Sequence, residues 1–230
     1  ECPASFASVG RDGRICLWDL RSSRPKHVVN AESTGTPLTA VHYLDEHRFI
    51  SGGSNGVVDL WDVRRVSSPL LDQNVHRLRS GLGYDDPEPP RPAAESIKAP
   101  GRGVASLSVT DAGDRMLVST KGGTINVYTV ANLQAPPMVL RGHHTDNFFS
   151  RACFSPDGHY VASGSSATGR LFVWEVIRPS SPLVYFHTQP SGTPPEPDVD
   201  VMSVDWSQTN GSQTACSLAA PCPVGSPGTR

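Results

Sequence analysis

Two arginines that follow Trp-Asp pairs carry the most specific potential chemistry in this sequence. The sequence reads WDLR at residues 18–21 and WDVR at residues 61–64. A guanidinium is a planar donor that can bind a carboxylate or backbone carbonyls through two hydrogen bonds while it is partly desolvated. Two such groups on one surface could bind a protein partner without any covalent step. The candidate partner-binding residues are Arg21 and Arg64, with the motif residues Trp18, Asp19, Trp61 and Asp62.

The same residues have an ordinary structural explanation. Residues i and i+2 of a strand lie on the same face, so each aspartate could form an exposed ion pair with the arginine two positions later, worth about 0–1 kcal/mol. Recurrence of the motif favours the binding role for Arg21 and Arg64. The tryptophans, in contrast, are flanked by apolar residues, and burial between sheets explains them.

Motifs for catalysis and for metal binding are absent from the sequence. The five cysteines form no C-x-x-C pair, and none of the eight histidines lies in an H-E-x-x-H motif or at ligand spacing from a cysteine. Glycine-rich segments such as SGGSNG lack the lysine and the following helix of a phosphate-binding loop. We therefore expect a non-catalytic protein without a metal or another cofactor.

The composition is that of one ordinary globular domain. The chain has 230 residues, of which 37% are hydrophobic, and a formal net charge of −2. This charge gives no reason to expect non-specific binding to nucleic acid or to a membrane. Two short basic patches, at residues 21–27 and 75–80, contain no interleaved aromatics and are interpreted as solvated loops. No direct nucleic-acid site is predicted.

Targeting and membrane signals are also missing from the sequence. No apolar run reaches the ~18 residues that would span a bilayer, and the first residues resemble no secretory signal. An odd, sparse cysteine count is typical of a reducing compartment. The first residue is glutamate and not methionine, so we expect a fragment of a longer protein.

Four repeated segments must position the two arginines. Residues 6–20, 49–63, 116–130 and 160–176 each read as a strand, a glycine-containing turn and a second strand. Those second strands close on the aromatic residues Trp18, Trp61, Tyr128 and Trp174. Further alternating runs, LTAVHYL, VASLSV and SRACF, precede the last three segments, and a fourth strand per unit is implied.

Four short antiparallel strands at a period of roughly 40–45 residues are typical of a propeller blade. The predicted fold is therefore all-β, a partial β-propeller of about three to four blades. In each blade the third strand ends on the same face, so we expect Arg21 and Arg64 to emerge on one face from adjacent blades. The propeller is assigned to residues 1–207, with proline-rich inserts at 66–100 and 190–200. Residues 208–230 are predicted to be a disordered, low-complexity tail that leaves the strand at 201–207 unpaired.

These segments resemble the WD-repeat family. The closing triplets WDL, WDV and WEV, the Gly-His pair at residues 142–143 and the SPDG element at residues 155–158 stand where that family has them. The resemblance implies a seven-bladed parent propeller. It also implies a hydrogen-bond chain within a blade through His143, Ser163 and Trp174, although the aspartate that would complete this chain is absent.

A closer resemblance is to the denticleless proteins, substrate receptors of the ubiquitin ligase built on cullin four. It is carried by SGGSNGVVDLWDVRR, by LTAVHYLDEHRF and by RGHHTDNFFSRACFSPDGHYVASGSS. The resemblance implies that Arg21 and Arg64 dock on the ligase adaptor and, through it, on the cullin. It implies substrates presented on the replication sliding clamp, roles in the cell cycle and DNA replication, and a nuclear location that could extend to the cytoplasm. The alternative is a WD-repeat scaffold of a nuclear complex outside any ligase.

Overall fold

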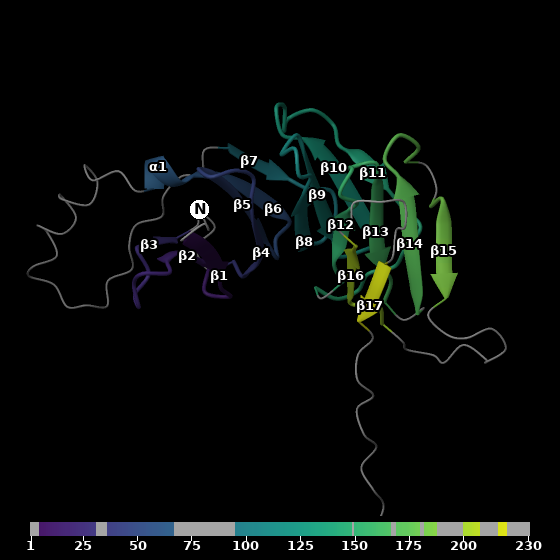
Figure 1. The fold of residues 1–230 in the computed structure, drawn as a ribbon, viewed down its shortest axis with the longest axis horizontal. Helices are drawn as coiled ribbons and strands as arrows, with labels where there is room; N and C mark the ends of the chain where they lie inside the picture. Colours follow the sequence, from purple (N-terminus) through teal and green to yellow (C-terminus); the bar gives the residue numbers. More distant parts are fainter. Residues whose placement is uncertain are drawn as a thin grey trace, which may run out of the picture.

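The computed structural model describes residues 5–30, 36–66, 95–148, 150–166, 169–179, 182–187, 200–207 and 216–219. In this part of the chain seventeen strands form five antiparallel sheets, and within each sheet the strands pair in sequence order. The one described helix spans four residues. Figure 1 shows these sheets following one another side by side, from the N-terminal sheet in purple to the green one. The prediction of an all-β, partial propeller is confirmed.

Each sheet is one blade or a part of one. The first blade has β1 (Ser5–Val9), β2 (Arg14–Asp19) and β3 (His27–Asn30). The second has β4 (Leu38–Tyr43), β5 (Arg48–Gly53), β6 (Val57–Asp62) and β7 (Glu95–Lys98), with the short helix α1 (Val63–Val66) after β6. The third has β8 (Val104–Val109), β9 (Arg115–Thr120), β10 (Thr124–Thr129) and β11 (Met138–Leu140). The fourth has β12 (Ala152–Phe154), β13 (Tyr160–Gly164), β14 (Arg170–Glu175) and β15 (Val184–His187).

Two strands begin a fifth blade, which corrects the prediction for the end of the chain. β16 (Ser203–Trp206) pairs antiparallel with β17 (Cys216–Ala219), so the strand expected to remain unpaired has a partner. The small and polar composition around β17 hid this strand, because it lacks the apolar alternation on which the prediction depended. The remaining residues of the predicted tail lie outside the described part of the chain.

The first predicted insert is also too long. Its last residues form β7, which pairs with β6 as the fourth strand of the second blade, and its first residue ends α1. Residues 67–94 of this insert, and residues 190–199 of the second insert, lie outside the described residues. The boundary was missed because ESIK has only one residue that becomes buried, Ile97.

Tight turns connect the second and third strands of the first two blades. Gly13 and Gly56 have φ values of 76° and 81°, a left-handed conformation that glycine adopts without steric cost. The side-chain oxygens of Asp12 and Asn55 accept hydrogen bonds from the backbone N–H groups two residues later, at 3.2 and 3.0 Å. Short polar side chains thus close both turns.

The core fills the spaces between neighbouring blades. Successive residues of a strand point to opposite faces, and β9 shows the consequence: Met116 and Val118 pack toward the second blade, whereas Leu117 packs toward the fourth. Between the first and second blades, Ile15 and Val29 pack with the buried Trp61. Among the described elements, the one helix spans four residues, and no helix is long and apolar enough to cross a bilayer.

Candidate protein-interaction face

The WD-x-R motifs lie at one of the two ends of the blades. Leu38 donates its backbone N–H to Gly10 in the β1–β2 turn, and Ser54 in the β5–β6 turn donates to the neighbouring Pro37. Both turns therefore meet at the start of β4. Because β2 and β6 are both six residues long and leave these turns in the same sense, their far ends lie together on the opposite face.

The turns between the first and second strands complete this opposite face. Val63, Val130 and Val176 each follow a third strand, and each donates its backbone N–H to the turn before the second strand, at His47, Asp114 and His159. We call the resulting surface the WD-x-R face. It comprises residues 19–26, 44–48, 62–66, 110–115, 129–131, 155–159 and 175–178. The other end is called the glycine-turn face and comprises residues 10–14, 53–56, 98–103, 121–124, 141–151, 164–170 and 200–202, apart from those outside the described ranges.

Each motif arginine forms a two-pronged ion pair with its own aspartate. The Nε and Nη2 groups of Arg21 donate to the two carboxylate oxygens of Asp19, at 2.9 and 2.7 Å. Arg64 repeats this geometry on Asp62, at 3.0 and 2.8 Å. The ordinary explanation, an ion pair between residues i and i+2, is therefore present in both blades. It does not exclude a partner, because two of the five guanidinium N–H donors are used and three remain.

The pairs hold both guanidinium groups in position while leaving them open to solvent. The Arg21 side chain is 80% exposed and the Arg64 side chain 65% exposed, whereas their aspartates are mostly covered. The hydrogen bonds from Arg64 lower the pKa of Asp62 to about 2, and those from Arg21 hold the pKa of Asp19 well below its usual range. Both carboxylates therefore stay ionised near neutral pH, and the two forks persist.

The motif tryptophans belong to the fold. Trp61 is almost fully buried, stacks on Phe49 and donates its indole N–H to the Ser51 hydroxyl at 2.9 Å. Trp18 repeats the arrangement with Phe6 and Ser8, with an indole distance of 2.8 Å.

The third predicted set, His143, Ser163 and Trp174, does not form the expected hydrogen-bond chain. The indole N–H of Trp174 donates to the backbone carbonyl of Arg141 at 2.9 Å, and the Ser163 hydroxyl donates to the carbonyl of Gly164 at 3.1 Å. Neither ring nitrogen of His143 has a partner among the described residues. Without an aspartate to orient it, the imidazole packs edge-on against Trp174, with ring centroids 5.3 Å apart.

Burial of the unpartnered imidazole has an electrostatic consequence. Desolvation, with a smaller contribution from His144, lowers the pKa of His143 from 6.5 to about 4. The ring is therefore neutral near pH 7 and behaves as an aromatic packing residue. Among the described residues, no group of three or more His, Cys, Asp or Glu side chains could hold a metal ion.

Comparisons with known proteins agree with this architecture. The model of the family "WD domain, G-beta repeat" matches residues 134–175, which span the end of the third blade and most of the fourth. The fold is part of a β-propeller, and residues 134–175 match one WD repeat.

The chain is, more specifically, similar to the denticleless proteins. It is 28% identical to Protein lethal(2)denticleless of Drosophila melanogaster over 79% of this chain and 26% of that protein, and 27% identical to Denticleless protein homolog A of Xenopus laevis over 92% and 32%. It is also 23% identical to Autophagy-related protein 16 of Arabidopsis thaliana, over 76% and 37%. The chain thus spans between a quarter and two fifths of the length of these relatives.

Proposed function

We propose that this chain is part of a substrate receptor of a cullin-RING ubiquitin ligase and that it docks on the ligase adaptor through Arg21 and Arg64. In this role the protein is non-catalytic, because ubiquitin transfer is carried out by other subunits. The proposal is supported by the similarity to denticleless proteins over most of the chain. It extends to the cullin, which the adaptor would connect to the receptor.

The observation that carries the proposal is the matched geometry of the two arginines. They project from adjacent blades on one face, each is held by two hydrogen bonds, and each keeps three N–H donors for another molecule. The ion pairs already restrict the conformations of both arginine side chains. Binding of a partner therefore costs less side-chain entropy, which favours binding. An isolated surface ion pair would need no such repetition.

The biological setting belongs to the same proposal. We place the protein in the nucleus, with a possible second location in the cytoplasm, and we propose that its substrates are replication and cell-cycle proteins bound to the replication sliding clamp. These assignments depend on the denticleless resemblance alone. They concern the whole protein, of which this chain covers one part.

A pulldown of the full-length protein that carries this sequence tests the docking role. The Arg21→Ala, Arg64→Ala double variant should lose the adaptor and the cullin. The matched control, Arg24→Ala with Arg65→Ala, removes two exposed arginines from the same face and should retain both. Unaltered recovery of the adaptor by the first variant would exclude docking through these arginines.

A second candidate is a WD-repeat scaffold of a nuclear complex outside any ligase. It is kept as an alternative because the chain also matches Autophagy-related protein 16, so similarity at this level is not confined to denticleless proteins. Identification of the proteins that co-purify with the full-length protein separates the two candidates. A cullin and its adaptor would be present only for the ligase receptor.

A further inference from the structure

The glycine-turn face forms one connected surface. Backbone hydrogen bonds join the turns of the second and third blades at Gly103 and Lys121, and those of the third and fourth blades at Gly122 and Thr145. The fourth blade continues to the fifth through a bond from Val201 to Ser165. Together with the contacts at the start of β4, these bonds run from the first blade to the fifth. Groups on neighbouring blades are therefore held at fixed separations.

Charge is distributed unequally between the two faces. On the WD-x-R face the described acidic and basic residues are equal in number. The described residues of the glycine-turn face include eight basic and three acidic residues. The basic residues are Arg11, Arg14, Lys98, Arg102, Lys121, Arg141, Arg151 and Arg170, and the acidic residues are Asp12, Asp146 and Asp200. A positive face on a chain with a net charge of −2 is a local feature and is not explained by composition.

The three carboxylates of this face are already engaged. Asp12 lies 3.7 Å from Arg14 and also accepts a backbone hydrogen bond. Asp146 lies 3.6 Å from the His144 ring, and Asp200 accepts a hydrogen bond from the Asn147 amide at 3.2 Å. Of these contacts, only the one between Asp12 and Arg14 is with a permanent cation, and the eight basic residues still outnumber the three carboxylates among the described residues of this face.

Four exposed arginines of the face have no carboxylate partner among the described residues. They are Arg11, Arg102, Arg141 and Arg151. On the opposite face, Arg21, Arg48 and Arg64 each pair with an aspartate within 3 Å, whereas Arg24 and Arg65 have no carboxylate partner among the described residues. A larger share of the guanidinium groups is therefore without a carboxylate on the glycine-turn face than on the WD-x-R face.

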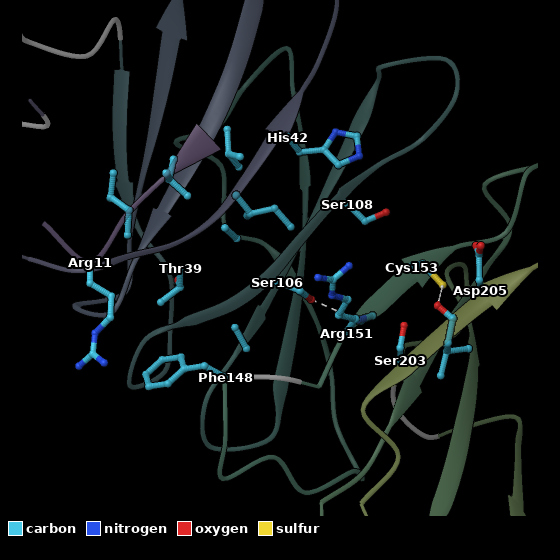
Figure 2. Close-up of a pocket in the computed structure, with 18 residues that line it drawn as sticks. Arg11, Thr39, His42, Ser106, Ser108, Phe148, Arg151, Cys153, Ser203 and Asp205 are labelled. Carbon is cyan, nitrogen blue, oxygen red and sulfur yellow. Dashed lines mark hydrogen bonds between the residues drawn. The ribbon is translucent and has the colours of Figure 1, made fainter. Parts of the chain in front are cut away.

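A cavity of about 820 Å³ opens between the innermost strands, and two of these arginines line it. Arg11, Arg151 and Phe148 contribute to its wall, together with small residues of β4 and β8 such as Thr39 and Ser106. Figure 2 shows Arg11 and Phe148 at one side of the cavity, with the Arg151 side chain extending near its middle. Asp205 is the one carboxylate among the lining residues, and Figure 2 shows it on the side away from Arg11.

We propose that the glycine-turn face binds an acidic peptide segment of a partner protein across the mouth of this cavity. Carboxylates of the segment would pair with Arg11, Arg102 and Arg151, whose planar forks suit bidentate contacts. A side chain of the segment would enter the cavity beside Phe148. This binding does not depend on adaptor docking, because it uses the opposite face.

The aromatic content of the face favours a peptide over a single-stranded nucleic acid. Nucleic-acid surfaces of this kind stack successive bases on several exposed aromatics. Here Phe148 is the one Phe, Tyr or Trp side chain among the described cavity-lining residues, and the Lys121 ammonium lies 5.2 Å from its ring centroid. Its edge is also close to Gly103, where an added Cβ would lie 3.0 Å from Cε1. Little of the ring remains for base stacking.

Fluorescence anisotropy with three labelled probes tests the proposal on the purified full chain. The probes are a peptide of alternating Glu and Ser around a central Phe, the same peptide with Lys in place of Glu, and an oligothymidylate of equal negative charge. We expect saturable binding of the glutamate peptide, weakening with salt, and little binding of the lysine peptide. Tighter binding of the oligothymidylate, or no binding of the glutamate peptide, would overturn the proposal.

Charge-reversal variants locate the binding. Arg11→Glu with Arg151→Glu should weaken binding of the glutamate peptide by at least about tenfold, and Arg102→Glu alone by a smaller factor. Arg24→Glu with Arg178→Glu makes the same change in net charge on the WD-x-R face and should alter the affinity by less than about twofold. An equal loss in both double variants would mean that only overall charge matters, and the site would be rejected. Circular dichroism confirms that each variant is folded.

Discussion

The first two blades and the next two end their third strands differently. In the first pair an arginine stands two residues after the acidic residue, whereas Ala131 and Ile177 occupy that position in the third and fourth blades. The later blades nevertheless form complete sheets and bury their closing aromatics, Tyr128 and Trp174. Ile177 is 72% exposed, so this position faces solvent there as well. The arginine is therefore not needed to build a blade.

The closing tryptophans lead to the opposite conclusion. Trp61 donates to a serine hydroxyl, and Trp174 donates to the backbone carbonyl of Arg141. Both are fully covered although their hydrogen-bond partners differ. What the blades share is the burial of a large aromatic side chain with a satisfied N–H group. The fold thus requires the closing aromatic residue of a blade but does not require the arginine that follows it.

The largest expected effect comes from removing a closing tryptophan between two blades. Trp61→Ala should lower the free energy of unfolding by about 3–5 kcal/mol, because it leaves a cavity between the first and second blades and an unpaired Ser51 hydroxyl. Trp18→Ala should cost roughly 1–2 kcal/mol, because Trp18 is only half-buried and its stacking partner Phe6 is 46% exposed. Urea denaturation measures both values. Equal losses in the two variants would contradict the assignment of the core to the spaces between blades.

The imidazole of the fourth blade gives the next effect, as a dependence on pH. The unfolded chain binds a proton at His143 below about pH 6.5, whereas the folded chain does so only below about pH 4. The free energy of unfolding should therefore fall as the pH drops from 6.5 to 4, by on the order of 3 kcal/mol from this group. His143→Phe should remove that part of the pH dependence and lose no hydrogen bond.

The control for this prediction is His159→Gln. His159 is exposed in a turn of the WD-x-R face, so its replacement leaves the buried imidazole of the fourth blade in place, and the fall attributed to His143 should persist. Denaturation curves at several pH values compare the two variants with the parent. If the slope of His143→Phe equals that of the parent, the buried, unpartnered state of this imidazole would be disproved.

The strands were predicted correctly where apolar and polar residues alternate strongly in the sequence. The prediction failed where this alternation is weak. The hairpins around WDLR and WDVR have glycine turns and apolar alternation, and both form as expected. The strands β7 and β17 have few apolar residues, and both fell inside segments predicted to be loop or tail. Edge strands of a blade bury less of their surface, so pairing with a neighbour, which no local pattern reveals, decides whether they form.

The candidate site was predictable only in part for a different reason. Spacing alone placed Arg21 and Arg64 on one face, because strand length and turn position are local properties. The hydrogen-bond chain expected through His143 depended on which acceptor the Trp174 indole N–H reaches. That acceptor is the backbone carbonyl of Arg141, 33 residues earlier in the sequence. The cations of the glycine-turn face were missed because Arg11, Arg102 and Arg151 come from different blades and share no motif.

The smallest expected effect on stability comes from replacing the two motif arginines, which the fold does not require. The Arg21→Ala, Arg64→Ala double variant should leave the urea midpoint of unfolding nearly unchanged, because both side chains are exposed and solvent-exposed ion pairs contribute little. Urea denaturation beside the parent measures this midpoint. A clear fall in the midpoint would show that the two forks hold the ends of β2 and β6 in place, and failure to bind a partner could then reflect damage to the blades. A near-zero change, together with loss of the adaptor, would show that the first two blades carry a binding function that the third and fourth lack.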